Sequence, residues 1–86
     1  MSDILLIHGT WTGGWMWKAV RDRLTARGHN VFSPTLTGLG EREHLLTRST
    51  DMETHISDLT GVIEYEMLDN IVLVGHSYAG MLMTAL

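Results

Sequence analysis

The sequence predicts an α/β fold in which a parallel sheet is covered by helices on both faces. Two short runs, residues 4–7 and 71–74, contain only aliphatic residues, and strands that are apolar on both faces are typical of covered parallel sheets. Between them, residues 15–27 and 50–67 carry apolar residues three or four positions apart, which predicts helices. Strands that alternate with helices favour parallel pairing.

The first strand, the first helix and the second strand occupy the N-terminal part of the chain. The run Ile4–Ile7 predicts the first strand. The expected helix, residues 15–27, is followed by Gly28, which is typical of a C-terminal cap. Its apolar face is formed by Trp17, Val20 and Leu24. Residues 30–33 predict a second strand, which ends before Pro34 because proline cannot donate to a central ladder.

A second helix and a third strand follow a loop at residues 35–49. Thr50 and Glu53 match a capping box, in which each of the two side chains bonds a backbone N–H of the first turn. The helix then carries an apolar stripe formed by Met52, Ile56, Leu59, Ile63 and Met67. Residues 71–74 predict the third strand, and residues 78–86 are apolar enough for a buried helix.

Composition and charge restrict the partners of the protein. Its 86 residues are enough for one small domain. Lysine and arginine number 6 against 10 aspartates and glutamates, and no basic cluster occurs, so neither nucleic acid nor a membrane is an expected partner. The absence of cysteine excludes disulfides, thiolate metal sites and cysteine nucleophiles. The N-terminus has no basic and apolar signal segment, so we expect a cytoplasmic protein.

The segment Gly75-His76-Ser77-Tyr78-Ala79 lies where the third strand turns into the last helix. This is the context of a nucleophile elbow, in which a serine on a sharp turn projects its hydroxyl above the carboxyl edge of the sheet. Small residues two positions before and after the serine allow the strand and the helix to approach. Ala79 stands where the strict pattern has glycine, and a methyl group is the mildest departure. The segment therefore predicts Ser77 as a catalytic nucleophile.

Together with this elbow, three further segments resemble the α/β-hydrolase family. They are Leu6-Ile7-His8-Gly9-Thr10-Trp11, Gly13-Gly14-Trp15 and Pro34-Thr35-Leu36-Thr37-Gly38-Leu39-Gly40. The resemblance covers essentially the whole chain and is to the branch of small bacterial esterases, plant methylesterases and hydroxynitrile lyases. It implies that residues 1–86 form the N-terminal part of a single α/β-hydrolase domain, with the first strand between the second and the third.

The resemblance also implies roles for residues near Ser77. The N–H groups of Thr10 and Tyr78 are expected to form the oxyanion hole. Right-handed crossovers bring these residues together at a switch point of the sheet, where ligands bind. Trp11 is expected either to pack or to line the acyl or alcohol pocket. In this family the acid, the base and the cap lie beyond residue 86, so we expect residues 1–86 alone to be inactive.

Several other residues are expected to be structural. His8 and His76 are expected to form local hydrogen bonds, because the base follows the serine in this fold. The histidines that lack any metal-ligand spacing are His29, His44 and His55. Trp15 and Trp17 are expected to anchor the core. Thr35 stands where many α/β-hydrolases have aspartate, which leaves the details of its loop open.

The predicted function is hydrolysis of a carboxylic ester or similar acyl compound through an acyl-enzyme on Ser77. The expected partner is a small-molecule ester, with no metal or organic cofactor; nothing in the sequence indicates an oligomeric state. A hydroxynitrile lyase is one alternative, although such lyases carry threonine where this chain has Gly9. A non-catalytic binding protein or receptor that retains the serine is another. Turnover of a p-nitrophenyl ester distinguishes an esterase from a binding protein.

Overall fold

The computed structural model describes residues 2–86 and contains a three-stranded parallel sheet. β1 (Asp3–Ile7) lies in the middle, with β2 (Asn30–Phe32) on one side and β3 (Val72–Gly75) on the other. β1 pairs with β3 from Ile4 opposite Val72 to Ile7 opposite Gly75. The strand order β2-β1-β3 confirms the predicted position of the first strand. It also places the carboxyl ends of β1 and β3 side by side.

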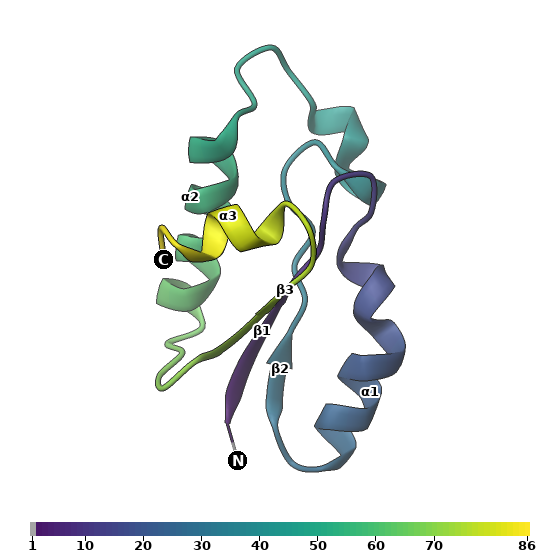
Figure 1. Ribbon diagram of the computed structural model, residues 1–86, viewed down its shortest axis with the longest axis vertical. Helices are drawn as coiled ribbons and strands as arrows, with labels where there is room; N and C mark the ends of the chain where they lie inside the picture. The colour runs from purple at the N-terminus through teal and green to yellow at the C-terminus, as the bar shows by residue number, and fades with distance from the viewer. Residues whose placement is uncertain (1) are drawn as a thin grey trace.

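Helices lie on both faces of this sheet (Figure 1). α1 (Lys18–Ala26) connects β1 to β2 on one side, while α2 (Met52–Tyr65) and α3 (Ala79–Met83) lie on the other. Right-handed crossovers that leave β1 in opposite directions require this arrangement. The predicted fold class, a parallel α/β sheet with helices on both faces, is therefore confirmed.

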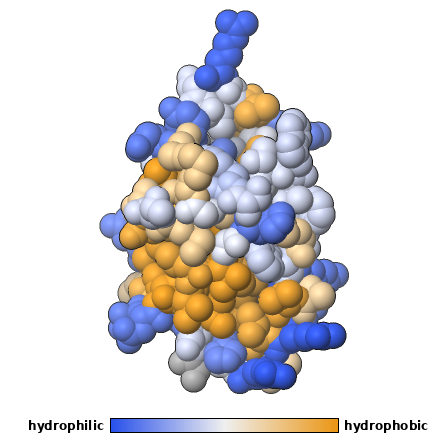
Figure 2. All heavy atoms as spheres, in the orientation of Figure 1, coloured by the Kyte–Doolittle hydropathy of each residue, from blue (hydrophilic) through white to orange (hydrophobic). Residues whose placement is uncertain are grey.

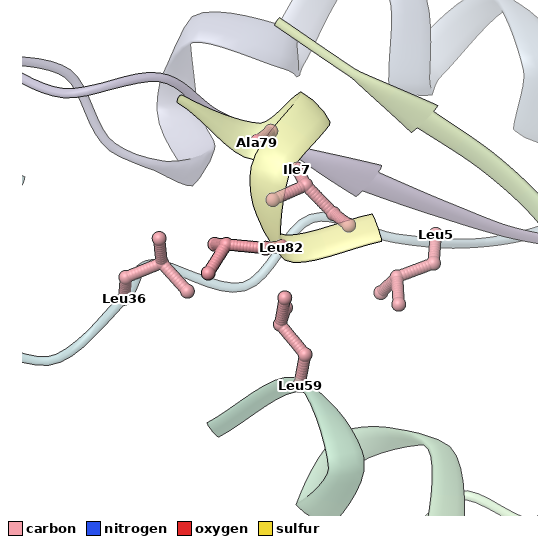
Figure 3. Close-up of a cluster of buried hydrophobic side chains, with 6 residues drawn as sticks. All are labelled: Leu5, Ile7, Leu36, Leu59, Ala79 and Leu82. Atoms are coloured by element: carbon pink, nitrogen blue, oxygen red, sulfur yellow. The ribbon is translucent and has the colours of Figure 1, made fainter. Parts of the chain in front are cut away.

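The main core lies between β1 and the helices α2 and α3 (Figure 3). Its buried side chains are Leu5, Ile7, Leu36, Leu59, Ala79 and Leu82. Leu5 and Ile7 point to the same face of β1 because side chains alternate along a strand. Full burial of such a side chain stabilises the fold by about 1.5–3 kcal/mol. The core therefore fixes the end of β1, where the loop toward the site begins.

β3 forms an edge of the sheet and exposes apolar side chains. Figure 2 shows a broad apolar surface in the lower half of the view, where β3 lies in Figure 1. Val72 is 46% exposed, whereas the β1 residues Ile4–Ile7 are at most 6% exposed. The aliphatic runs 4–7 and 71–74 both predict strands that are covered on two faces. Within residues 2–86 only β1 has that environment.

The first helix begins later than predicted. Gly14–Trp17 form a separate 3₁₀ turn, and α1 starts at Lys18. Trp15 is 56% exposed, so its predicted role as a core anchor is wrong. The 3₁₀ turn instead leaves the Trp15 ring exposed, with its Nε1 beside the buried Gly13. Trp17 is half-buried, and within residues 2–86 its buried Nε1 has no hydrogen-bond acceptor.

The second helix also differs from the prediction at both ends. Asp51, not Thr50, is the N-cap: its carboxylate accepts from the Thr54 N–H at 3.0 Å, and the Thr54 hydroxyl accepts from the Asp51 N–H at 3.2 Å. The predicted Thr50–Glu53 capping box is wrong. Thr50 and Asp51 are adjacent and both residue types are good N-caps, so the pattern did not distinguish which of them begins the helix. α2 ends before Met67, which has a φ of 51° and is 84% exposed instead of continuing the apolar stripe.

Candidate active site

Ser77 lies on a sharp turn between β3 and α3. Its φ is 59°, in the left-handed region that residues other than glycine rarely adopt. The turn is closed by two backbone hydrogen bonds, from Ala79 N–H to the His76 carbonyl at 3.2 Å and from Gly80 N–H to the Ser77 carbonyl at 3.0 Å. Ser77 is exposed. Strained backbone at an exposed polar residue is typical of a functional site.

Small residues allow β3 and α3 to meet at this turn. A Cβ added to Gly75 would lie 2.5 Å from the Met83 sulfur and 2.9 Å from the Ala79 Cβ. Gly75 is therefore required by the close approach of the helix. The methyl group of Ala79 is fully buried at this contact, so the departure from glycine there is accommodated. A Cβ added to Gly80 would meet nothing within 4 Å.

The loop after β1 lies directly against the turn. The His76 N–H donates to the Ile7 carbonyl at 3.2 Å. A Cβ added to Gly9 would lie 3.0 Å from both the His76 carbonyl oxygen and the Ser77 Cβ. The backbone of Gly9 therefore runs in contact with the Ser77 side chain. The structure thus brings together the two segments that were predicted to form one site.

The N–H groups predicted for the oxyanion hole have no partner within residues 2–86. Neither the Thr10 N–H nor the Tyr78 N–H donates to a protein acceptor, whereas the next amides along the turn do. Thr10 is exposed and follows Gly9, while Tyr78 follows Ser77. An oxyanion hole requires amide donors that no protein acceptor occupies. Both N–H groups meet this requirement, and their role in an oxyanion hole stays a prediction.

Both ring nitrogens of His8 form hydrogen bonds with backbone groups. Its ring is fully buried, and the Leu36 N–H donates to its Nε2 at 3.0 Å. The proton therefore resides on Nδ1, which donates to the Gly9 carbonyl at 2.7 Å. Burial lowers the pKa of His8, which favours this neutral form. The predicted local hydrogen bonding is confirmed for His8. His76 differs: its exposed ring forms no hydrogen bond within residues 2–86.

The side chain of Tyr78 has a partner that the sequence did not reveal. His55 of α2 is buried, and its Nε2 donates to the Thr37 carbonyl at 2.9 Å. Its Nδ1 therefore accepts from the Tyr78 hydroxyl, also at 2.9 Å. The two rings pack edge to face with centroids 5.6 Å apart. A structural role was predicted for His55, but its link to the residue after Ser77 was missed.

Comparison with known proteins agrees with this geometry. Residues 4–86 match the family model described as the alpha/beta hydrolase family. The chain belongs to the alpha/beta hydrolase family. Carbendazim hydrolyzing esterase of Nocardioides sp. (strain SG-4G) is 48% identical over 84 residues, or 98% of this chain and 35% of that protein. Methylesterase 8 of Arabidopsis thaliana is 32% identical over 81 residues, or 93% of this chain and 30% of that protein.

A solved alpha/beta hydrolase has the same arrangement of elements. The extracellular alpha/beta-hydrolase from a Paenibacillus species matches with a TM-score of 0.85 and 25% identity, over 96% of this chain and 33% of that chain. It is described as sharing structural and functional homology with tobacco Salicylic Acid Binding Protein 2. The resemblance predicted from the sequence is confirmed. This hydrolase chain spans about a third of the length of these relatives.

Trp11 of this hydrolase chain extends into solvent beside the loop. The side chain is 92% exposed, with a φ of 73° at its backbone, so of the two roles expected for Trp11 it does not have the packing role within residues 2–86. It lines a shallow cavity of about 250 Å³ together with residues of the segment 38–46. The other expected role, in which Trp11 lines an acyl or alcohol pocket, stays a prediction.

Two further findings concern the described residues of the hydrolase chain. In the part of the chain that the structure describes, histidines, aspartates and glutamates form no group of three that could hold a metal ion. None of the helices within residues 2–86 combines the length and the apolar character of a membrane span.

Proposed function

We propose that the whole protein hydrolyses a carboxylic ester or similar acyl compound through an acyl-enzyme formed on Ser77. The observation that carries the proposal is the left-handed turn at Ser77, in contact with Gly9 and flanked by the unpaired N–H groups of Thr10 and Tyr78. Relatives that are named esterase and methylesterase support an ester as the substrate.

These positions support the following steps. The Ser77 hydroxyl gives its proton to a base while its oxygen attacks the ester carbonyl, and the carbonyl oxygen becomes an oxyanion that accepts from the N–H groups of Thr10 and Tyr78. Collapse of this intermediate passes the proton from the base to the leaving oxygen, which releases the alcohol and leaves the acyl group on Ser77. Water then attacks the acyl carbon, which releases the acid and restores the hydroxyl. No metal or organic cofactor takes part in these steps.

Serine needs a base to become an effective nucleophile. Both ring nitrogens of His8 and of His55 are engaged in hydrogen bonds away from Ser77. In this fold the acid and then the base follow the nucleophile along the chain. We therefore expect residues 1–86 alone to show no Ser77-dependent turnover of p-nitrophenyl acetate.

Trp11 is proposed to contact the substrate. Trp11 follows Thr10 in the loop and lines the cavity of about 250 Å³. An aromatic face at this position offers a large apolar contact to an acyl or alcohol group. The expected substrate is thus a small-molecule ester with an apolar part.

The test is turnover of p-nitrophenyl acetate by the whole protein, with Ser77→Ala as the control. We expect multiple turnovers that depend on Ser77. A wild-type protein that binds the ester without turnover contradicts the proposal and favours a binding protein. Turnover that survives in Ser77→Ala contradicts the assignment of the nucleophile.

A further inference from the structure

We propose that Glu41 is a positioning residue that holds the oxyanion-hole loop through Thr35. This inference rests on the proposed function, in which the loop 8–14 supplies the Thr10 N–H to the oxyanion. Glu41 and Thr35 do not touch the substrate in this role. They fix the backbone that does.

Thr35 lies between the loop and Glu41. It is 7% exposed, and its Oγ1 accepts from the Gly14 N–H at 2.8 Å and lies 2.7 Å from Glu41 Oε2. A hydroxyl has one proton and a carboxylate only accepts, so the Thr35 O–H donates to Glu41. Its lone pair is thereby left for Gly14, and bonds in such a chain strengthen one another. We call this chain of bonds, Gly14 to Thr35 to Glu41, the loop relay.

Glu41 also contacts the loop with its second carboxylate oxygen. A Cβ added to Gly13 would lie 2.7 Å from Glu41 Oε1 and 2.5 Å from Trp15 Nε1. A Cβ added to Gly14 would overlap the Ser33 carbonyl oxygen. The two glycines leave the space that the carboxylate and the carbonyl occupy. Both oxygens of Glu41 are therefore used at the end of this loop.

The loop is held at both ends and free in the middle. At its start the Gly9 carbonyl accepts from the Thr12 hydroxyl at 2.9 Å and from the His8 ring at 2.7 Å. At its end the loop relay holds the backbone. Thr10 lies between these two anchors. Movement of either anchor displaces its N–H, and a misplacement of about 1 Å can cost roughly 100-fold in rate.

The surroundings of Glu41 keep it ionised at neutral pH. The hydrogen bond from Thr35 is the main cause that lowers the pKa of Glu41, followed by a bond from its own backbone N–H, with smaller contributions from His8 and Trp15. Glu41 also lines a cavity of about 410 Å³. The charged side chains of α1 that line this cavity are Lys18, Arg21 and Asp22. An amide at position 41 is a weaker acceptor and can itself donate to Thr35, which disrupts the loop relay.

The kinetic test measures kcat and KM for p-nitrophenyl acetate in variants of the whole protein. Glu41→Gln and Thr35→Val are each expected to lower kcat about 10- to 100-fold, with KM changed by less than about twofold. The double variant is expected to lose no more than either single variant, because both act through one relay. Thr35→Ser keeps the hydroxyl and is expected to stay within about threefold of wild type.

Glu64→Gln is the matched control, because Glu64 is exposed on α2 and forms no hydrogen bond through its side chain within residues 2–86. It is expected to leave kcat unchanged. Equal kcat values in Glu41→Gln and Glu64→Gln overturn the inference. So does a Thr35→Ser variant that is as slow as Thr35→Val.

A second measurement separates this inference from the proposed function and needs no turnover. The backbone amide shift of Gly14 is followed by NMR in Ser77→Ala protein while the pH is lowered through the titration of Glu41. We expect the Gly14 amide to titrate with Glu41, and this titration to disappear in Glu41→Gln but not in Glu64→Gln. A Gly14 amide that does not follow Glu41 overturns the loop relay. Absence of Ser77-dependent turnover in the unmodified protein contradicts the proposed function instead.

Discussion

The loop after β1 and the turn after β3 meet at one edge of the sheet but are stabilised in different ways. The loop, residues 8–14, begins with the buried His8 and is held by hydrogen bonds at both ends. The turn, residues 75–78, is largely exposed and has Ser77 in a left-handed conformation. The comparison shows a hydrogen-bonded loop beside an exposed turn. In the proposed reaction the loop supplies a hydrogen-bond donor, and the turn supplies the nucleophile.

Substitutions in the turn are therefore expected to change the chemistry more than the fold. Ser77→Ala in the whole protein is expected to lower turnover by about 10⁶-fold, by comparison with a related triad. The free energy of unfolding is expected to change by less than about 0.5 kcal/mol, because Ser77 is an exposed residue. Ester turnover and urea denaturation measure the two quantities. A variant that keeps more than about a tenth of wild-type turnover contradicts the assignment.

Gly9 is the point of contact between the two regions. Gly9→Val is expected to push against the turn at Ser77 and to lower turnover by about 100- to 1,000-fold. The crowding is expected to cost a smaller share of stability, about 1–3 kcal/mol. Gly61→Val is the matched control, since a Cβ at Gly61 meets nothing within 4 Å. Proportionate losses of turnover and stability in Gly9→Val would make Gly9 a structural residue only.

The hydrogen bond between His55 of α2 and Tyr78 is expected to stabilise the turn. Tyr78→Phe removes the hydroxyl that donates to the buried His55. An unsatisfied buried acceptor costs about 1–3 kcal/mol, so the free energy of unfolding is expected to fall by that amount. Tyr65→Phe is the control, because Tyr65 is 87% exposed. Equal stability of the two variants in urea denaturation contradicts a stabilising role for the His55 bond.

The smallest expected effect concerns the pH dependence of the loop. Burial holds the pKa of His8 below its usual value of 6.5. Below pH 6.5 the unfolded chain binds a proton that the folded chain excludes, so the contribution of His8 to stability is complete above that pH. This contribution decreases as the pH falls from 6.5 through the pKa of His8 in the folded protein, by at most about 1.4 kcal/mol per pH unit.

Urea denaturation of wild type and His8→Asn at several pH values between about 7.5 and 5 covers this window. The variant is expected to be less stable at the upper end and to have a flatter pH dependence. Parallel curves for the two proteins contradict the assignment of this pH dependence to His8.

Local patterns explain why much of the fold and the turn were predictable. The runs 4–7 and 71–74 match β1 and β3 within one residue, because a short aliphatic run is typical of strands in parallel sheets. The elbow was also predictable, since Gly75, Ser77 and Ala79 lie within five residues and satisfy the steric demands of a strand-to-helix turn.

Contacts between residues that are distant in the sequence could not be predicted from local patterns. His55 and Tyr78 are 23 positions apart, and no spacing rule connects them. The sequence flagged Thr35 as a departure from aspartate, but only the structure shows that Glu41 brings a carboxylate to it. The exposure of Trp15 likewise follows from a 3₁₀ turn, which apolar periodicity does not distinguish from the first turn of an α-helix.

The most direct test of the account is to trap the acyl group. The whole protein is mixed with p-nitrophenyl acetate, quenched in acid at short times, and digested for mass spectrometry, with Ser77→Ala treated in parallel. We expect an acetyl group on the peptide that contains Ser77, at the Ser77 oxygen, which forms during the first turnover and disappears when substrate is exhausted. Steady turnover with no acetyl group on Ser77, or with the acetyl group on another residue, contradicts the account.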